Sequence, residues 1–411
     1  MGSSPSTVSG GSLQVQTQSS DVASKSGKPF TELDESLRPA TPVAKKRPGR
    51  FVVATAEHDA LLRALLRDNP MPGSIEISLE REPNYFAGAA IDGAECTTIV
   101  SLENGRAICA GAANIRVRYI NGEAMRVGYL GSLRLDNTHR GRSSILLRAY
   151  QFFRDLHRTH ADPPRIYLSS ILSKNLPAIR FLERNLPEMP TYTRVTELIA
   201  LMIRPKRRGP SLPTGTGIRI ATNDDLPAIA AFLNQQNQVY QFAPFWTPEG
   251  LGSCVGLTPA DFQLMHDAGG NLLACGAIWD QRPFRQNVIR GYSPRMRKLR
   301  PLFNVAARLL RRSPIHDVGH VIPLAFASHL AATTPASLVV LLQSLRRAAF
   351  ERGIQFLTAG FDSRDPRLAA IRSQFRAREY PSRLYAVRWD DGQSLAQSLD
   401  ERLLNPDVSL L

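Results

Sequence analysis

Two arginines and a glycine stand where an extended segment gives way to a helix, and they could hold a charged ligand. Arg140, Gly141 and Arg142 lie in a polar loop after the apolar-rich run 126–135. Apolar residues then recur at offsets of three and four, which predicts a helix: Leu146, Leu147, Tyr150 and Phe153. The first turn of a helix presents unpaired backbone N–H groups and the positive end of the helix dipole. The segment therefore predicts a cradle for a phosphate or diphosphate group.

The same run resembles the pyrophosphate loop with which the GCN5-related N-acetyltransferase (GNAT) superfamily binds acetyl-CoA. The shared pattern is Leu133-x-Leu135-x-Asn137-x-x-Arg140-Gly141-Arg142-Ser143. Family members usually carry further glycines where this chain has Ser143, Ser144 and Ile145. Serine is small and its hydroxyl can bond a phosphate oxygen, which favours a weakened site over a lost one. The resemblance implies that the diphosphate of acetyl-CoA, or of another acyl-CoA, is held by five residues: Arg140, Gly141, Arg142, Ser143 and Ser144.

A second motif of the family follows in the same order along the chain. Asn175 comes after the short apolar run 165–169 and begins a predicted helix that contains Ala178 and the pair Phe181-Leu182. In relatives this helix flanks the pantetheine and adenine side of the cofactor, so Asn175 and Phe181 are expected near the cofactor. The resemblance covers about residues 51–205.

Acyl transfer from a thioester to an amine requires a held carbonyl, a deprotonated amine and a proton for the departing thiolate. In the family, the strand that corresponds to Leu133, Arg134 and Leu135 separates from its neighbour, and its backbone binds the pantetheine arm and polarises the carbonyl. Many relatives have a tyrosine as the acid where this chain has Leu182. Tyr129 and Tyr192 are the candidates to replace it, although a strand tyrosine is more often a packed aromatic. Direct transfer in a ternary complex also tolerates a missing acid.

The elements that would position this loop recur in the second half of the chain. We expect an α+β protein with two tandem GNAT folds, each a mixed, mostly antiparallel twisted sheet flanked by helices. In place of the diphosphate loop, the second copy has His329–Pro335 without the Arg-Gly pattern, so we expect it not to bind diphosphate in the usual way. The predicted segments are a disordered Ser/Gly/Pro-rich basic tail (1–48), an acyl-CoA-binding domain (49–205), a linker (206–217), a diverged GNAT-like domain (218–392) and a C-terminal tail (393–411).

Composition and charge narrow the class of protein further. Hydrophobic content of 43% is ordinary, and four scattered cysteines have no metal-binding spacing, so we expect reduced cysteines, no metal, no transmembrane segment and a cytoplasmic location. The net charge is +15, and residues 282–312 contain ten Lys or Arg and no Asp or Glu. A solvated basic face is the preferred interpretation, and an anionic partner is the alternative. Within it, the amphipathic piece 302–312 is expected to pack on its own domain, with an anionic membrane surface as the alternative.

The function that these patterns favour is N-acylation, with acetyl-CoA or another acyl-CoA as co-substrate and a small-molecule or peptide amine as acceptor. One alternative is a tandem transferase that uses aminoacyl-tRNA as donor, in which residues 282–312 would bind RNA. The other is a degenerate protein that binds CoA for regulation without turnover.

Overall fold

The computed structural model describes residues 49–88, 91, 93, 95–309 and 314–411, and all of them belong to one compact unit. The predicted tail, 1–48, lies outside the described residues. The first half of the described chain contains, in order, β1 (Phe51–Val53), α1 (Asp59–Asp68), β2 (Ile75–Glu80), β3 (Glu95–Glu103), β4 (Arg106–Ile120), β5 (Glu123–Leu135), α3 (Ser143–Thr159), β6 (Tyr167–Leu172), α4 (Leu176–Leu182) and β7 (Thr191–Ile203).

Residues 204–216 contain neither helix nor strand, and the second half then repeats the series. Its elements are β8 (Gly217–Ile220), α5 (Leu226–Asn237), α6 (Pro248–Gly252), β9 (Phe262–His266), β10 (Leu272–Trp279), β11 (Gln286–Tyr292), α7 (Pro294–Leu309), β12 (Leu324–Ala332), α8 (Pro335–Glu351), β13 (Phe356–Asp362), α9 (Arg367–Gln374), β14 (Arg378–Arg388) and α10 (Gln393–Gln397).

The local sequence explains the sharpest turns of the first half. The predicted hairpins at Asn104-Gly105 and Asn121-Gly122 are confirmed: they join β3 to β4 and β4 to β5. All four residues have a positive φ, between 51° and 89°, as two-residue hairpin turns require. The long strands β4 and β5 are therefore paired in one register from Ile120↔Glu123 up to Ala112↔Gly131, where a bulge begins.

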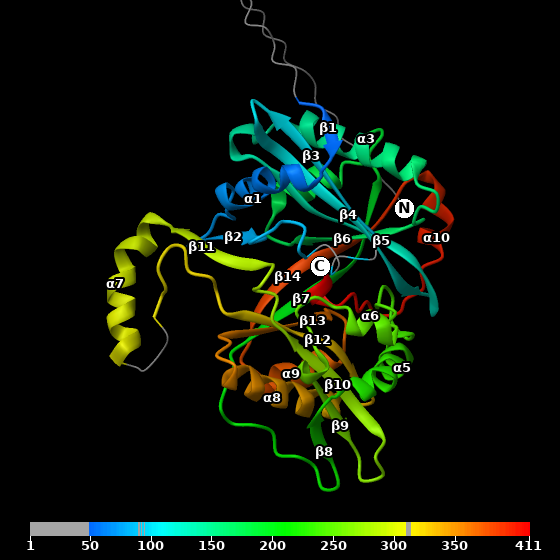
Figure 1. Ribbon diagram of the computed structural model, residues 1–411, viewed down its shortest axis with the longest axis vertical. Helices are drawn as coiled ribbons and strands as arrows, with labels where there is room; N and C mark the ends of the chain where they lie inside the picture. Colours follow the sequence, from blue (N-terminus) through cyan, green and yellow to red (C-terminus); the bar gives the residue numbers. More distant parts are fainter. Residues whose placement is uncertain (1–48, 89–90, 92, 94, 310–313) are drawn as a thin grey trace, which may run out of the picture. The chain divides into compact units, whose positions relative to one another are not determined.

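Twelve strands form one sheet, in the order β1-β3-β4-β5-β6-β14-β7-β13-β12-β10-β9-β8 (Figure 1). The order reads the same from both edges if each strand is matched with its counterpart in the other half. At the centre the halves exchange their last strands, because β14 pairs with β6 and β7 pairs with β13. The predicted α+β fold in two copies is confirmed, and the two copies share this sheet. The division into domains at 206–217 stays a prediction.

Matching backbone details support the correspondence of the halves. Thr55 and Thr222 each cap a short 3-10 helix after the first strand of their half, with nearly identical backbone angles (φ −118° in both) and a capping box. Ser132 in β5 and His329 in β12 both have a positive φ, 54° and 53°, next to a register shift with the neighbouring strand.

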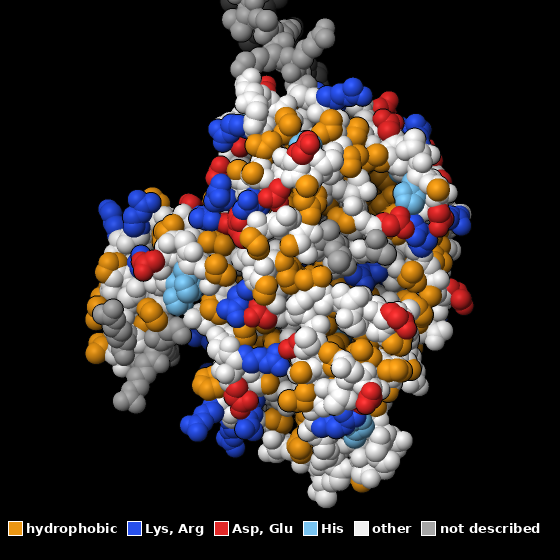
Figure 2. Space-filling view, viewed as in Figure 1, with side chains coloured by type: hydrophobic (Ala, Val, Ile, Leu, Met, Phe, Trp, Pro, Cys, Tyr) orange, Lys and Arg blue, Asp and Glu red, His pale blue; other side chains and the backbone are white. Residues whose placement is uncertain are grey.

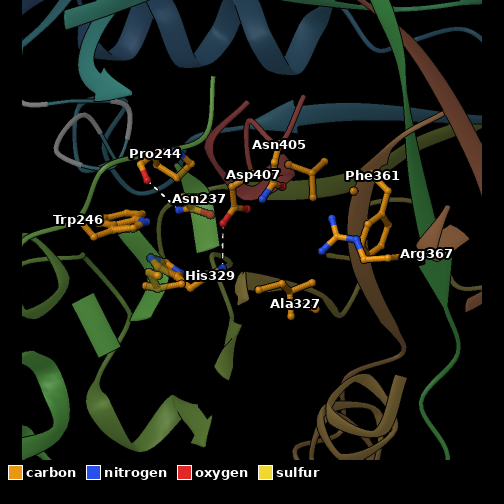
Figure 3. A pocket seen from close by; sticks show the side chains of 13 residues that line it. Asn237, Pro244, Trp246, Ala327, His329, Phe361, Arg367, Asn405 and Asp407 are labelled. Atoms are coloured by element: carbon orange, nitrogen blue, oxygen red, sulfur yellow. Dashed lines mark hydrogen bonds between the residues drawn. The ribbon is translucent and has the colours of Figure 1, made fainter. Parts of the chain in front are cut away.

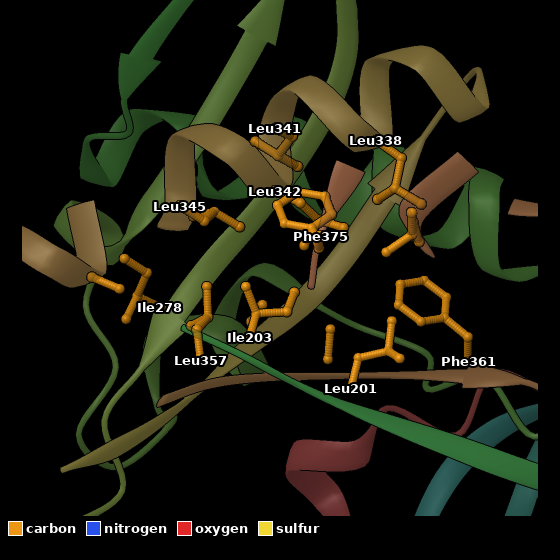
Figure 4. Close-up of a cluster of buried hydrophobic side chains, with 14 of the residues drawn as sticks. Leu201, Ile203, Ile278, Leu338, Leu341, Leu342, Leu345, Leu357, Phe361 and Phe375 are labelled. Atoms are coloured by element: carbon orange, nitrogen blue, oxygen red, sulfur yellow. The ribbon is translucent and has the colours of Figure 1, made fainter. Parts of the chain in front are cut away.

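Helices and sheet bury separate apolar clusters in the two halves. In the second half, α8 lays Leu338, Leu341, Leu342 and Leu345 on β7, β13 and β10, where Leu201, Leu357 and Ile278 are buried (Figure 4). In the first half, α3 buries Ile145, Ala149, Tyr150 and Phe153 in the same way. Each half can thus hold one face of the sheet through one amphipathic helix.

The halves differ by insertions. Asn121 and Gly122 join β4 to β5, whereas residues 280–323 stand between the corresponding strands β10 and β12. This insertion contains β11, which pairs with β2 of the first half in a separate two-stranded sheet, and α7. Neither β11 nor its partner was predicted as part of a second sheet.

Candidate active site

A groove opens where the parallel strands β5 and β6 separate. They are paired at Gly128↔Tyr167 and Tyr129↔Leu168, and beyond this point the Ser169 hydroxyl donates a hydrogen bond of 2.9 Å to the Leu130 carbonyl. In the described chain, no β6 residue is paired with Gly131, Ser132 or Leu133. Their backbone groups on that side are therefore available to a ligand.

The groove has a volume of about 490 Å³ and extends into the second half. From the first half it takes residues of β4, β5, β6, α3 and α4, including Ala112, Leu133, Ser169, Ala178 and Tyr150. From the second half it takes Arg282, Arg285 and Asn287 near β11 and Phe326 and Thr358 on β12 and β13. Its size is that of a small-molecule or cofactor site, and its lining contains residues of both halves.

Three predicted cofactor residues on β5 are placed differently. Leu133 and Arg134 line the groove, whereas Leu135 packs on the apolar cluster beneath α3. Burial lowers the pKa of the Arg134 guanidinium, and no described residue forms an ion pair or hydrogen bond with it. A cation in such surroundings favours an anionic ligand group.

The predicted diphosphate loop ends at the first turn of α3. Arg140, Gly141, Arg142, Ser143 and Ser144 are exposed, and Arg142 is the N-cap without a side-chain hydrogen bond. Gly141 has a φ of +86°, a conformation that glycine adopts without strain, and no atom lies within 4 Å of a Cβ built there. None of the five lines the groove itself; they lie just past its β5 wall.

His139 anchors this loop. The sequence predicted a solvated histidine, and this was wrong: His139 is 9% exposed, and its Nε2 lies 2.8 Å from a Glu103 carboxylate oxygen. Thr138 holds the other ring nitrogen at 2.9 Å. The loop before Arg140 is thereby fixed to the β3–β4 turn, which keeps the first turn of α3 in place.

The second-motif residues are also divided between groove and core. Asn175 caps α4, with its Oδ1 3.4 Å from the Ala178 amide, and lines the groove. Phe181 is buried in the cluster beneath α3 and does not line the groove, whereas its neighbour Leu182 does.

The two predicted catalytic tyrosines have different surroundings. Tyr129 is half-buried, lines the groove and is paired with Asn114 of β4. Tyr192 is buried behind the groove, and its hydroxyl lies 2.7 Å from that of Tyr150, which does line the groove. Burial raises the pKa of Tyr192 to about 12 and also raises that of Tyr150, so both phenols keep their protons at neutral pH.

Sequence reasoning missed three polar residues of the groove. The side chains of Asn114, Gln281 and Thr358 are 5%, 2% and 7% exposed, and each has one oxygen without a hydrogen-bond partner. All three line the groove, so ligand N–H or O–H groups can satisfy them. An isolated Asn or Gln between apolar residues gives no pattern from which this role can be predicted.

The corresponding separation in the second half is filled. β12 and β13 are paired from Leu324↔Phe356 to Phe326↔Thr358 and then diverge, yet the space beyond has a volume of only about 20 Å³. Asn405, Asp407 and Val408 of the C-terminal segment enter it (Figure 3). The Asp407 carboxylate accepts a hydrogen bond of 2.8 Å from the His329 amide, and a Cβ at Gly360 would lie 2.7 Å from that of Val408.

Other classes of site find little support in the described residues. No group of three or more His, Cys, Asp or Glu side chains there could hold a metal ion. None of the helices in the described ranges is long and apolar enough to cross a membrane. The four cysteines are free, with Cys109 and Cys275 buried.

Comparison with known proteins gives matches in structure alone. No family model matches the sequence, and no curated protein is similar to it. N-myristoyltransferase from Saccharomyces cerevisiae with bound myristoyl-CoA is similar in structure, with a TM-score of 0.57 and 10% identity over 85% of this chain and 87% of that one. A structure of the same enzyme with bound myristoyl-CoA and inhibitors gives a TM-score of 0.56 and 10% identity, covering 88% and 86%.

A GCN5-related N-acetyltransferase from Sphaerobacter thermophilus also matches, with a TM-score of 0.45 and 15% identity over 71% of this chain and 80% of that one. The matches to N-myristoyltransferase extend over most of both chains, so they include both halves of the twelve-stranded sheet. The chain therefore has the GNAT-type fold in the duplicated form that it shares with N-myristoyltransferase.

Proposed function

We propose that this protein is an acyltransferase that moves an acyl group from acyl-CoA to the amine of a small molecule or peptide. The observation that carries the proposal is the open groove between β5 and β6, which ends beside a helix start with two arginines. The fold shared with an enzyme that binds myristoyl-CoA supports an acyl-CoA in this place.

The donor would lie along β5. The unpaired backbone of Gly131, Ser132 and Leu133 would bind the pantetheine arm and polarise the thioester carbonyl. The first turn of α3, with Arg140 and Arg142, would hold the diphosphate through N–H groups and charge. The loop predicts acetyl-CoA as donor, and the volume of about 490 Å³ beside Gly111 and Ala112 gives room for a longer chain.

The acceptor amine would approach from the part of the groove lined by the second half. Its nitrogen attacks the thioester carbon, the C–S bond breaks, the nitrogen loses a proton and the thiolate gains one. Tyr150, whose phenol is protonated and backed by Tyr192, can supply the proton to sulfur. The described groove lining contains no Asp, Glu or His, so the amine would enter in its neutral form. Tyr129, which also lines the groove, is the candidate to orient it.

Calorimetric titration with acetyl-CoA and with myristoyl-CoA, followed by an assay of free thiol with a panel of amines, tests this proposal. In the variant Arg140→Ala/Arg142→Ala we expect affinity to fall about 100-fold, because two charge-assisted contacts are lost. The matched variant Arg207→Ala/Arg208→Ala removes two exposed arginines from the segment between the halves and should bind as the wild type does.

Binding without thiol release from any amine would refute the transferase and favour a CoA-binding regulator. Absence of binding by the wild type would refute the acyl-CoA site itself. The aminoacyl-tRNA alternative is not favoured, since such a donor makes no use of a diphosphate site.

A further inference from the structure

Helix α7 (Pro294–Leu309) carries a surface that the proposed reaction does not use. It belongs to the insertion 280–323, which replaces a two-residue turn of the first half, and it projects beside the sheet (Figure 1). One side of the helix is held by the residues that follow it. Asn304 exchanges two hydrogen bonds with the backbone of Ile315, and Arg300 pairs with Asp317 and covers the ring of Tyr292.

The opposite side is uncovered. Arg295, Lys298, Leu302, Val305 and Leu309 recur at spacings of three and four, so they lie in one line along the helix. Leu302 is two residues from both Arg300 and Asn304, which in a helix of 3.6 residues per turn places it on the far side from them. Leu302, Val305 and Leu309 are 68%, 54% and 79% exposed, and Phe303 beside them is 47% exposed. The expectation that this helix packs fully on its own domain was therefore wrong.

The exposed line is cationic in its first half and apolar in its second. Arg295, Arg297 and Lys298 are exposed, and the structure shows no acidic group paired with them within its described residues. The other arginines of the basic region are used internally, since Arg282 pairs with Asp280 and Arg290 with Glu80. The space-filling view shows Lys and Arg together with hydrophobic side chains on this projecting part (Figure 2).

We propose that α7 docks the protein on an anionic lipid surface. Lys and Arg would contact lipid headgroups, and the leucines and valine would enter the boundary between headgroups and acyl chains. A second copy of the chain is a poor occupant, because the same cations would face each other. The residues 1–48 carry six Lys or Arg against four Asp or Glu, so their net charge does not complement the helix either. A nucleic acid would pair with the cations and leave the large apolar side chains in water.

Vesicle flotation of the full chain tests this proposal. Wild type should float with vesicles of equal parts phosphatidylcholine and phosphatidylglycerol and remain unbound with phosphatidylcholine alone. The variant Leu302→Ser/Leu309→Ser should lose at least about tenfold in partitioning, and Arg295→Gln/Lys298→Gln about fivefold for each charge removed. Two matched controls should bind like the wild type: Ile220→Ser/Val239→Ser, whose side chains are each 59% exposed elsewhere, and Arg207→Gln/Arg208→Gln.

The exposed positions of these side chains predict unchanged thermal unfolding for every variant, which distinguishes a lost surface from a lost fold. Failure of the wild type to bind anionic vesicles overturns the proposal, as does equal binding by the leucine variant. A change from dimer to monomer in the leucine variant, with vesicle binding retained, would instead assign the face to a second copy. The proposal is independent of the acyl-CoA site, since binding of acyl-CoA by the α7 variants should remain that of the wild type.

Discussion

The two halves of the sheet separate a pair of parallel strands at corresponding places, but only one separation is open. Between β5 and β6 lies a groove of about 490 Å³, whereas about 20 Å³ remains between β12 and β13. Both places have a residue of positive φ, Ser132 and His329, and a bulge beside it. The same backbone device therefore serves two purposes, and what occupies the separation decides which.

The filled separation is closed by the chain itself. Asp407 and Val408 occupy the place that corresponds to a ligand site in the first half, and the Asp407 carboxylate meets the His329 amide there. His329 is covered further by Trp246, whose ring centroid lies 4.4 Å from that of the histidine. A separation of strands stabilises the fold when filled and can bind a ligand when left empty.

The largest expected effect comes from filling the open groove. Ala178→Trp on α4 places a large ring in the groove lining, and we expect acyl-CoA affinity to fall more than about 100-fold, because ligand and ring compete for the same volume. Calorimetry measures this loss. Ala369→Trp, exposed on the corresponding helix α9, is the matched control and should keep the wild-type affinity. Equal weakening by both changes would mean that the groove is not the site.

The next effect concerns the filled separation. Asp407→Ala leaves the amide of His329 without its acceptor and should lower the free energy of unfolding by about 3 kcal/mol. Denaturant titration measures it. Asp407→Asn keeps an acceptor oxygen and a residue that tolerates the φ of 57°, so its cost should be about 1 kcal/mol. If the alanine variant is as stable as the wild type, the segment does not close this space.

The buried histidine predicts a dependence of stability on pH. Burial lowers the pKa of His329 to about 4, against about 6.5 in the unfolded chain, so below pH 6.5 the unfolded state binds more protons. Stability present above about pH 6.5 should be lost progressively as pH falls towards 4, by up to about 3 kcal/mol. His329→Asn, which tolerates the positive φ, should remove this part of the slope in unfolding experiments at a series of pH values. An unchanged slope would show that His329 is not held neutral.

The smallest expected effect is that of Asn114→Ala. The Asn114 Oδ1 has no partner in the protein, so the substitution should weaken acyl-CoA or acceptor binding about fivefold, the worth of one neutral hydrogen bond. Titration of each ligand in turn shows which of the two the oxygen meets. Unaltered affinity for both would exclude Asn114 from the site.

Much of this comparison could be predicted from the sequence, because it depends on local patterns. Apolar spacing gave α3, Asn-Gly pairs gave the hairpins, and the Arg140 loop was placed correctly before a helix. The exchange of β7 and β14 was beyond prediction, since alternation of side chains shows a strand but not its partner. The C-terminal segment was read as a tail because Asn405–Val408 has no periodicity. Its role depends on contacts such as that of Asp407 with His329, far apart in the chain.

The most direct measurement is a crystal structure of the full chain with a non-hydrolysable acyl-CoA analogue. We predict the acyl carbonyl at the backbone of Gly131–Leu133, the diphosphate at the first turn of α3, and Asp407 and Val408 still in the second separation. Density for the analogue between β12 and β13, with the C-terminal segment displaced and the first groove empty, would contradict the assignment of the open groove as the acyl-CoA site.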